Sequence, residues 1–343
     1  MFIQSLREYF RGIYHHHSRM VNNAIFCVVV FLLCANGAMG DYKEKSLDWP
    51  RLNVRPLGMG GAFVALADDE SAIYHNPAGL GKLRRFRIGT SHSMQHFPGP
   101  IENLDQFDCD PTVIVYPTRI GTYARGFTLQ GELGYDYLER NSEIYPRERL
   151  WGWESYEGYG VCLTPWTYFG FAHRTNEYDF NDGTGEWYEA AWRKRGEGGS
   201  VGVIQSIIPG VDYGFTQHQL DYNYDDGRSG RTKRTVQGIN LSPTAWLDLG
   251  WQKEKVKYKR RDPYDNVDTE VDTQRSSGGE LRVGKLFKYR WGNMDGHKTW
   301  GYSWKVLWYE SHRAYVEDML PMMIDGYPDE FTDYKCKGFT VEF

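Results

Sequence analysis

Two features of this chain could bind a charged ligand: a glycine-rich segment and several acidic pairs. Gly58, Gly60 and Gly61 could form a phosphate-binding loop, but the lysine spacing and the strand–helix–strand setting of such a loop are absent. Asp68-Asp69 and Asp225-Asp226 could contribute to a calcium site, yet isolated acidic pairs are more typical of solvated loops. Neither feature predicts a nucleotide or metal site.

Histidine and cysteine form no recognisable catalytic or metal-binding pattern. The cysteines that follow residue 40 are odd in number and widely spaced, which fits neither a disulfide framework nor a metal site: Cys109, Cys162 and Cys336. Four histidines fall on different predicted strands or loops, without a serine or aspartate partner that the sequence can place: His173, His218, His297 and His312. We therefore predict that the protein is not an enzyme and uses no cofactor or metal.

The N-terminal residues predict export. The apolar run at residues 24–35 is shorter than the roughly 20 residues that a membrane-spanning helix needs. Arginines precede this run, and Ala38-Met39-Gly40 follows it with small residues where a signal peptidase cleaves. We interpret residues 1–40 as a Sec signal peptide that is cleaved after Gly40; the alternative is a buried core helix.

The composition favours strands and excludes nucleic-acid binding. Aromatic residues make up 16% of the chain, and 38 glycines stand against only 14 prolines, a mixture that suits pleated strands and tight turns. The mean hydropathy of -0.61 is too low for helical membrane spans but is compatible with a barrel whose strands face lipid at every second residue. The net charge is -5, and no basic block indicates a nucleic-acid partner.

Long segments alternate between apolar and polar residues, which predicts strands. In residues 127–137 the aromatic residues and leucines share one face, and in residues 302–308 Tyr302, Trp304 and Trp308 do the same. A soluble β-sandwich would alternate too. However, residues 123–138 and 244–260 exceed the 9–11 residues or so that cross a membrane in a tilted strand, whereas ordinary strands average about 5–6.

A weak repeat gives the order of turns and loops. Three units consist of a strand, a tight turn at Pro165, Pro209 or Pro243, and a second strand. Each unit is bounded by glycines, which are Gly160 and Gly170, Gly202 and Gly214, and Gly238 and Gly250. Long charged stretches separate the units and are predicted to be external loops: 140–152, 181–199, 225–233, 261–278 and 316–333.

We predict an all-β fold, a transmembrane antiparallel β-barrel of 12–14 strands over residues 86–343. The twelve predicted strands are 86–96, 110–117, 121–139, 151–164, 167–180, 199–208, 211–224, 232–242, 245–260, 278–288, 299–313 and 331–343. Two further strands before Arg85 would make fourteen. At the end of the chain, the spacing of Gly338, Val341 and Phe343 resembles the signal that the barrel-insertion machinery reads in the last strand.

Residues 55–83 carry a resemblance to a known family. The motifs Gly58-Met-Gly60-Gly61-Ala, Ala-Asp68-Asp69 and Asn76-Pro77-Ala-Gly79 occur in this order just after the predicted signal peptide. This arrangement resembles the N-terminal segment of the FadL-like outer-membrane superfamily, most closely its PorV/PorQ branch. The resemblance implies that residues 41–85 form a hatch that plugs the barrel lumen; the alternative is a static element that fills a wide barrel.

The resemblance also implies a function in the outer membrane of a Gram-negative (diderm) bacterium. The expected function is transport of small hydrophobic molecules across that membrane. Two alternatives are a type IX secretion accessory that binds exported proteins through its outer loops and a structural, porin-like barrel. Residues 319–324 could grip such a ligand or partner, and the basic runs 193–195 and 260–261 are expected to face solvent or lipopolysaccharide phosphates.

Overall fold

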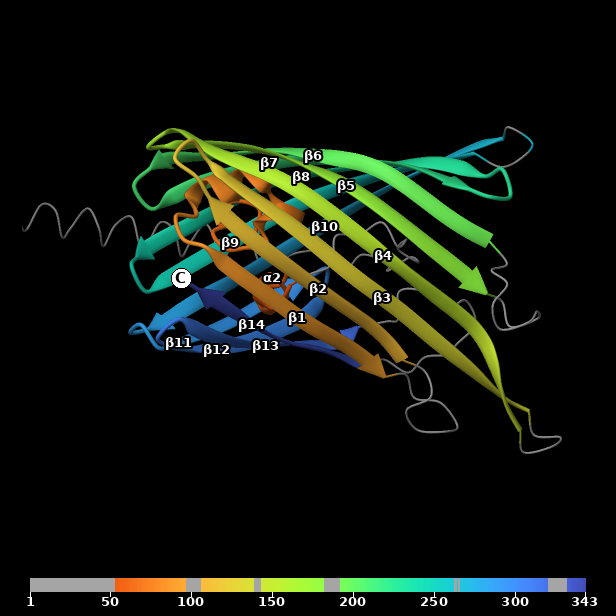
Figure 1. Cartoon of the computed structure of the whole chain (residues 1–343). Coiled ribbons are helices and arrows are strands. Elements are labelled where there is room, and N and C mark those ends of the chain that lie inside the picture. Colours follow the sequence, from red (N-terminus) through yellow and green to blue (C-terminus); the bar gives the residue numbers. More distant parts are fainter. Residues whose placement is uncertain are drawn as a thin grey trace, which may run out of the picture.

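The chain folds into one closed antiparallel β-barrel of fourteen strands in a computed structural model (Figure 1). The structure describes residues 53–96, 106–138, 143–181, 192–261, 264, 266–319 and 332–343. The predicted signal peptide, residues 41–52 of the predicted hatch and residues 320–324 of the predicted apolar patch lie outside these residues. Within the described part of the chain, no helix is long and apolar enough to span a membrane.

The strands follow one another around the barrel in sequence order, and the last one pairs with the first. The first seven are β1 (Arg87–His96), β2 (Gln106–Pro117), β3 (Thr122–Leu138), β4 (Glu143–Thr164), β5 (Thr167–Asn181), β6 (Trp192–Ile208) and β7 (Val211–Tyr224). The other seven are β8 (Ser229–Thr244), β9 (Leu247–Arg261), β10 (Val267–Val283), β11 (Phe287–Met294), β12 (His297–Val306), β13 (Tyr309–Met319) and β14 (Thr332–Glu342).

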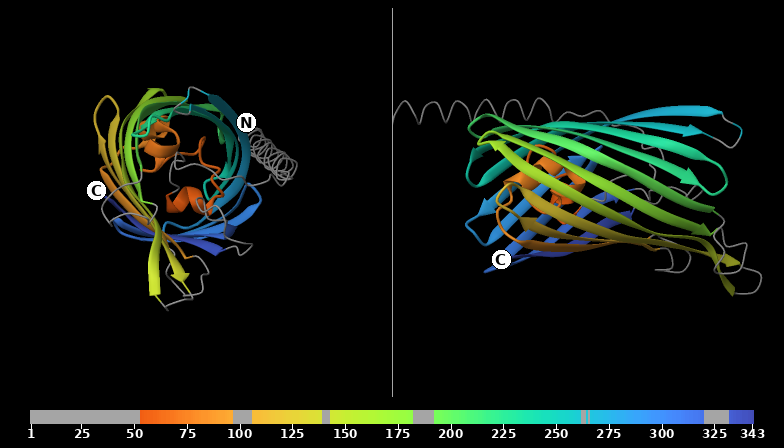
Figure 2. Two further views of the ribbon diagram at one scale, coloured as in Figure 1. Left: turned by 90° about the vertical axis from the view of Figure 1, so that its right-hand side faces the viewer. Right: turned by 45° about the horizontal axis from the view of Figure 1, so that its top comes forward.

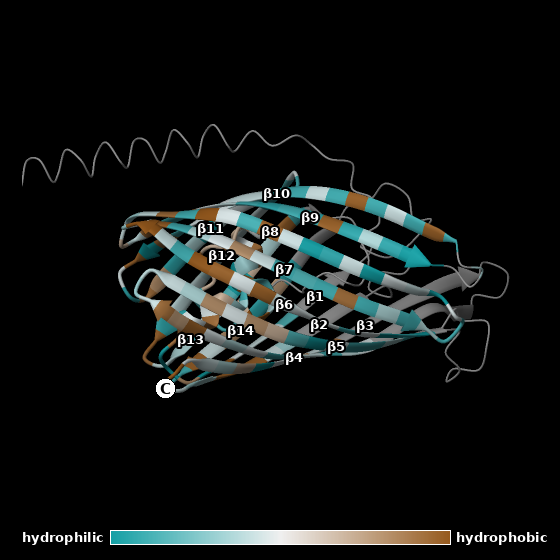
Figure 3. Cartoon of the chain, turned by 90° about the horizontal axis from the view of Figure 1, so that it is seen from above, coloured by the Kyte–Doolittle hydropathy of each residue, from teal (hydrophilic) through white to brown (hydrophobic). Residues whose placement is uncertain are grey.

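Many polar side chains are buried on the inner face of the wall, and many apolar side chains are exposed on its outer face. On β8, Thr232, Arg234 and Asn240 are buried on the inner face, whereas Ile239 is exposed on the outer face. Large apolar side chains are exposed near the tight turns of many strands, as expected for an outer surface in contact with lipid. Figure 3 shows the hydrophobic residues gathered toward the end of the barrel where the C-terminus lies.

The barrel has fourteen strands because two predicted strand regions each contain a turn. Residues 284–286 separate β10 from β11, and residues 307–308 separate β12 from β13. The prediction that two extra strands could precede Arg85 is wrong, because residues 53–85 contain none. Asp295 and Gly296, which link β11 to β12, have φ angles of 53° and 99°, as in the mirror-image turns that Asp-Gly favours in hairpins.

Much of the predicted external loop sequence is strand instead. The predicted loop 261–278 is mainly β10, and the predicted loops before residues 152 and 199 contain the first parts of β4 and β6. These stretches are rich in charged residues and do not alternate regularly between apolar and polar residues, so they lack the pattern that indicates a strand. The strands therefore continue beyond the apolar part of the outer surface.

The wall is uneven in height. β3 and β4 contain 17 and 22 residues, whereas β11 and β12 contain only 8 and 10. Figure 1 shows β11, β12 and β13 ending far short of β3 and β4. The end with the tight turns is more regular. Pro165 and Pro209 lie in tight turns as predicted, but Pro243 lies inside β8, where the register shifts between Leu241 and Thr244.

The C-terminal residues close the barrel. On β14, Val341 lies opposite Ile88 of β1 and Tyr309 of β13. The backbone N–H of Phe343 donates a hydrogen bond of 3.0 Å to the carbonyl oxygen of Phe86, and its ring stacks on Trp308 with 6.3 Å between ring centroids. Gly338 also lies on β14, opposite Ser91. The closure is thus explained, while the role of these residues as an insertion signal stays a prediction.

Candidate functional site: the segment inside the barrel

Residues 53–83, here called the lumenal segment, lie inside the barrel (Figure 2). The segment contains the short helices α2 (Val54–Gly58) and α3 (Ala72–His75) and the 3-10 helix η1 (Pro77–Lys82). Almost all of its residues are buried, although most of these helices are only about one turn long. Helices this short are not stable alone, so the contacts with the wall must hold the segment in place.

One side of the lumenal segment is an apolar core shared with the wall. Phe63, Ile73 and Leu80 are completely buried in it and are surrounded by further small and apolar residues of the segment. The wall contributes apolar residues of β2 to β6, which are Val113, Val115, Ala124, Tyr156, Ala172 and Ile204. The ring of Tyr74 meets that of Tyr156 edge-on, with 4.7 Å between centroids. This side is held by van der Waals packing and burial of apolar surface.

The wall meets the backbone of the lumenal segment at a row of glycines, one on the inner face of each strand from β4 to β11. A Cβ atom at any of them would lie within 2.8 Å of an atom of the segment. This glycine row consists of Gly160, Gly170, Gly202, Gly214, Gly238, Gly250, Gly278 and Gly292. Several members lie directly opposite one another in the register, for example Gly170 opposite both Gly160 and Gly202. The segment can approach the wall this closely only where side chains are missing.

The lumenal segment follows the glycine row around the inner wall in the direction opposite to the strand order. Its first turn reaches Gly292 and Gly278 on β11 and β10, and its last turn reaches Gly160 on β4. Six of the eight glycines are those that bound the repeat units in the sequence. The repeat is visible in the sequence, but nothing in the sequence indicates that its glycines contact the segment.

Two motif glycines have the positive φ angles that favour glycine. Gly60 and Gly61 have φ angles of 63° and 78°, and a Cβ atom at Gly60 would lie 2.6 Å from the backbone nitrogen of Asn293 on β11. Gly58 ends α2, and its carbonyl oxygen accepts a hydrogen bond from the hydroxyl of Thr299. Gly79 packs against Ala67, whose carbonyl oxygen would be 1.8 Å from a Cβ atom at Gly79.

Asn76 and Pro77 connect two parts of the lumenal segment and the wall. The Asn76 side-chain nitrogen donates to the carbonyl oxygens of Val64, at 2.7 Å, and of Val203 on β6, at 3.3 Å. The side-chain oxygen accepts from the backbone N–H of Ala78, which caps η1, and Pro77 is the first residue of that helix.

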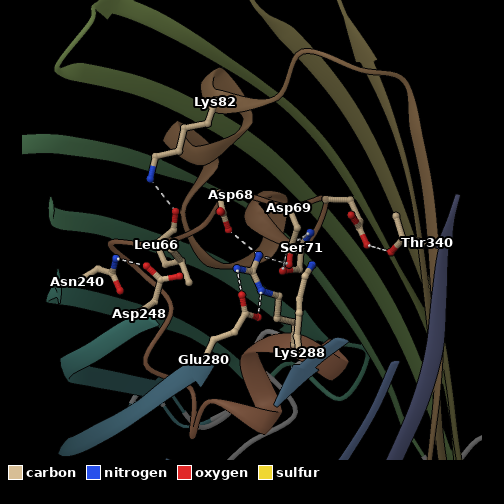
Figure 4. Close-up of polar contacts among 12 residues, drawn as sticks. Leu66, Asp68, Asp69, Ser71, Lys82, Asn240, Asp248, Glu280, Lys288 and Thr340 are labelled. Carbon is tan, nitrogen blue, oxygen red and sulfur yellow. Dashed lines mark hydrogen bonds and ion pairs between the residues drawn. The ribbon is translucent and has the colours of Figure 1, made fainter. Parts of the chain in front are cut away.

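The other side of the lumenal segment is charged, and Asp68 and Asp69 face Glu280 of the wall there (Figure 4). Arg55 forms two hydrogen bonds with Glu280 of β10, at 2.8 and 3.1 Å, and contacts Asp68 at 2.5 Å and Asp69 at 3.1 Å. Glu280 is completely buried and also accepts a hydrogen bond of 2.7 Å from Arg290 of β11. The structure thus brings Asp68 and Asp69 together around one arginine, which the sequence did not predict.

The charges of this cluster stabilise one another. Burial lowers the pKa of Arg55, but the neighbouring carboxylates of Asp68 and Glu280 outweigh burial and raise that pKa well above its ordinary value. Burial raises the pKa of Asp68, and Arg55 and Lys82 outweigh burial so that the net effect is a lowered pKa. Arg55 and Asp68 therefore remain charged over the physiological pH range. They tie the lumenal segment to β10 by paired, buried charges.

Glu70 and His75 are buried without such compensation. Burial, reinforced by the charge of Asp69, raises the pKa of Glu70 to about 7. One Glu70 oxygen accepts a hydrogen bond of 2.5 Å from the hydroxyl of Thr340 on β14. Burial and the nearby Arg234 lower the pKa of His75 to about 3, so this histidine is neutral at ordinary pH.

Lys82 anchors the end of the lumenal segment. Its ammonium group donates hydrogen bonds to the carbonyl oxygens of Ala65 and Leu66, at 3.2 and 2.7 Å, and lies 3.7 Å from the carboxylate of Asp212 on β7. Burial lowers the pKa of Lys82 from its ordinary value.

Two cavities adjoin the charged side of the lumenal segment. One, of about 170 Å³, lies between the segment and the wall, with Arg55, Glu70 and His312 among the residues around it. The second, of about 610 Å³, lies near Lys82, Asp212 and Arg282. Charged and polar side chains line most of both cavities, so an apolar molecule would find few favourable contacts in either of them.

The remaining sequence candidates do not come together. His173 is exposed on the outer face of β5, whereas His312 lies on the inner face of β13, 3.1 Å from the hydroxyl of Thr340. Cys162 is exposed, and Cys336 is buried on β14. Among the described residues, no group of three histidine, cysteine, aspartate or glutamate side chains is placed to hold a metal ion.

A closed fourteen-stranded barrel with this topology has the fold of the FadL-type outer-membrane barrels. The toluene transporter TodX of Pseudomonas putida is similar with a TM-score of 0.61 and 10% identity, covering 86% of this chain and 99% of TodX. For the toluene transporter TbuX of Ralstonia pickettii the TM-score is 0.62 and the identity 12%, covering 87% of this chain and 100% of TbuX. A FadL homologue of Pseudomonas aeruginosa has a TM-score of 0.51 and 10% identity, covering 84% of this chain and 96% of the homologue.

At such identities the similarity concerns the fold alone. No protein-family model matches the sequence, and no curated protein matches it. Assignment to the PorV/PorQ branch therefore stays a prediction.

The glycine row predicts that added side chains displace the lumenal segment. In Gly170→Ala, the new Cβ would lie 2.3 Å from the backbone carbonyl of Pro77, and such overpacking costs about 1–3 kcal/mol. We expect lower thermal stability and a higher ion conductance in planar bilayers. Gly58→Ala is the control, because its nearest neighbours would be at 3.4 Å, an ordinary contact. Equal conductance of both variants and the unmodified protein would contradict this role of the row.

We expect a large loss of stability when the buried cation of Arg55 is removed. Arg55→Gln leaves Glu280, Asp68 and Asp69 without their shared partner, which should lower the free energy of unfolding by about 3–5 kcal/mol. Arg85→Gln is the control, since its ion pair with Glu342 involves an arginine side chain that is 69% exposed and should matter by less than about 1 kcal/mol. Denaturant unfolding of both variants measures the difference. A similar small effect for both would show that the cluster does not hold the segment.

The raised pKa of Glu70 leads us to expect that the stability of the barrel depends on pH. Its folded-state pKa of about 7 exceeds its ordinary value of 4.5, so the folded barrel keeps this proton after the unfolded chain has lost it. The stability that Glu70 contributes is therefore greatest below pH 4.5 or so and is lost as the pH rises to about 7. Glu70→Gln mimics the protonated form, so the melting temperature of the variant should exceed that of the unmodified protein increasingly over this range. A difference that is constant with pH would refute the assignment.

Proposed function

We propose that the protein is an outer-membrane channel for small hydrophobic molecules, with the lumenal segment as its hatch. The observation that carries this proposal is a lumen filled by an N-terminal segment in a barrel whose fold is similar to that of the toluene transporters TodX and TbuX. The apolar outer surface near the tight turns supports placement in a membrane. Residues 1–40, read as a Sec signal peptide, support export to the outer membrane of a Gram-negative bacterium.

The two sides of the lumenal segment suggest how such a hatch opens. The charged side cannot separate from β10 without breaking the two buried, charge-assisted hydrogen bonds between Arg55 and Glu280, which is costly. The apolar side, around Ile73 and Leu80, loses only contacts that an apolar ligand can replace. We therefore place the hydrophobic path between the lumenal segment and β2 to β6, with the Arg55–Glu280 contact as the fixed side of the hatch.

The charged lining of the two cavities also supports a hydrophobic path on the apolar side of the lumenal segment. A hydrocarbon gains little in a space lined by Arg55, Glu70 or Arg282, because the polar groups there would lose water without gaining a partner. The path proposed here therefore requires movement of the segment on its apolar side. A static filler would leave no such path.

Uptake by cells tests the proposed function. Gram-negative cells that express the barrel should take up radiolabelled toluene or a long-chain fatty acid several-fold faster than cells with an empty vector. Uptake of a hydrophilic disaccharide is the control, and it should not change, because the lumenal segment fills the lumen. Ile73→Asp, which places a charge on the apolar side, should abolish the gain if the barrel still inserts and migrates in its heat-modifiable form.

Two outcomes would contradict the proposal. Equal uptake of the hydrophobic probes with and without the barrel would exclude transport of these molecules. Faster uptake of the disaccharide would instead indicate an open, porin-like barrel. Stable association of exported proteins with a barrel that does not transport would favour the secretion accessory that the PorV/PorQ resemblance suggests.

A further inference from the structure

The outer surface of β8, β9 and β10 carries a strip of positive charge. On β9, every second residue from 253 to 259 is a lysine, and all four point outward because the residues between them are on the inner face. Lys233 of β8 and Arg275 of β10 lie beside these lysines on the outer face. This basic strip consists of Lys233, Lys253, Lys255, Lys257, Lys259 and Arg275.

The basic strip has no counter-charge among the described residues. None of its six side chains forms an ion pair with a residue that the structure describes. Like charges even lie directly opposite each other, with Lys257 against Lys233 and Lys253 against Arg275. Such pairs across strands are destabilising. The strip therefore costs folding free energy unless an anionic partner from outside the chain faces it.

Other basic residues on the outer wall are already paired. Arg231 forms hydrogen bonds with Asp221 of β7, and Arg193 and Arg195 contact Asp179 and Glu177 of β5. Lys194 is buried on the inner face, with its ammonium group 4.2 Å from the ring centre of Tyr222. The basic run 193–195, expected from the sequence to face solvent or lipopolysaccharide, is thus largely neutralised within the wall.

The height of the basic strip places it at the surface of a membrane. On the outer face of β9, Leu247, Leu249 and Trp251 directly precede Lys253. With a strand rise of about 3.3 Å and a tilt of about 40°, Lys253 lies roughly 15 Å and Lys259 roughly 30 Å above Leu247 along the barrel axis. The apolar belt of such barrels is about 25 Å tall. The strip therefore spans the upper edge of the belt, where lipid headgroups are.

We propose that the basic strip binds the phosphate groups of anionic lipid headgroups in the outer leaflet. Its continuity with the apolar belt favours a lipid over a soluble anion, because the acyl chains can pack on Leu247 and Trp251 while phosphates contact the lysines above them. Lysine side chains are long enough to reach headgroups from the edge of the apolar region. This inference rests on the proposed placement in an outer membrane, but not on which molecule passes through the barrel.

Lipid binding by the purified barrel tests this inference. Binding of bis-phosphorylated lipid A is compared with that of dephosphorylated lipid A in mixed detergent micelles. Lys255→Gln/Lys257→Gln should weaken binding of the phosphorylated lipid by about tenfold or more, because each basic residue near an anionic surface contributes strongly. Binding should also weaken as salt is raised, and the dephosphorylated lipid should bind both proteins equally.

Two further variants complete the test. Lys335→Gln/Lys337→Gln removes two exposed lysines with the same spacing from β14 and should change the affinity by less than twofold. Lys255→Arg/Lys257→Arg keeps the charge and should retain binding. Equal binding by the glutamine variant of the strip and the unmodified protein, or an equal loss for the β14 variant, would overturn the assignment. Uptake of toluene is measured on the same variants, so failure of lipid binding is distinguished from failure of transport.

Discussion

The close approach of the lumenal segment to the glycine row is the constraint on which the rest of the structure depends. A lumen enclosed by fourteen strands is too wide to be filled by wall side chains alone. The chain fills it with its own N-terminal residues, and those residues lie directly against the backbone of eight consecutive strands. This contact requires glycine at matching heights on each strand, so the register of the whole barrel and the course of the segment depend on each other.

The same constraint divides the attachment of the segment into two kinds. Near β10 and β11, the segment cannot be released without separating buried charges around Arg55 and Glu280. Near β2 to β6, it is held by apolar packing, whose contacts an apolar ligand can replace. An element that is fixed on one side and exchangeable on the other has the physical properties that a hatch for apolar molecules needs.

The fold could be predicted from the sequence because its main signals are local. The alternation around Phe127 or Trp304 and the turns at Pro165 and Pro209 each depend on a few neighbouring residues, and the motif from Gly58 to Gly79 was recognised by resemblance. The turn at Asp295-Gly296 is a local signal of the same kind. By contrast, the pairing of Arg55 with Glu280 joins residues that are 225 positions apart, and nothing in the sequence around either residue indicates the other. The outward lysines of β9 were visible as an alternating pattern, but their lack of counter-charges depends on the residues of β8 and β10 beside them.

The uneven wall affects the route by which a molecule reaches the lumen. The difference between the long strands β3 and β4 and the short strands β11 and β12 corresponds to roughly 25 Å along the barrel axis. On the tall side, the wall separates the lumen from its surroundings far above the apolar belt. On the short side, the Asp295-Gly296 turn ends the wall close to the height of that belt. A solute concentrated in the outer leaflet thus has a shorter path to the lumen over β11 and β12 than over β3 and β4. The rate at which such a solute reaches the lumen would then depend on its partition into the lipid rather than on its concentration in water.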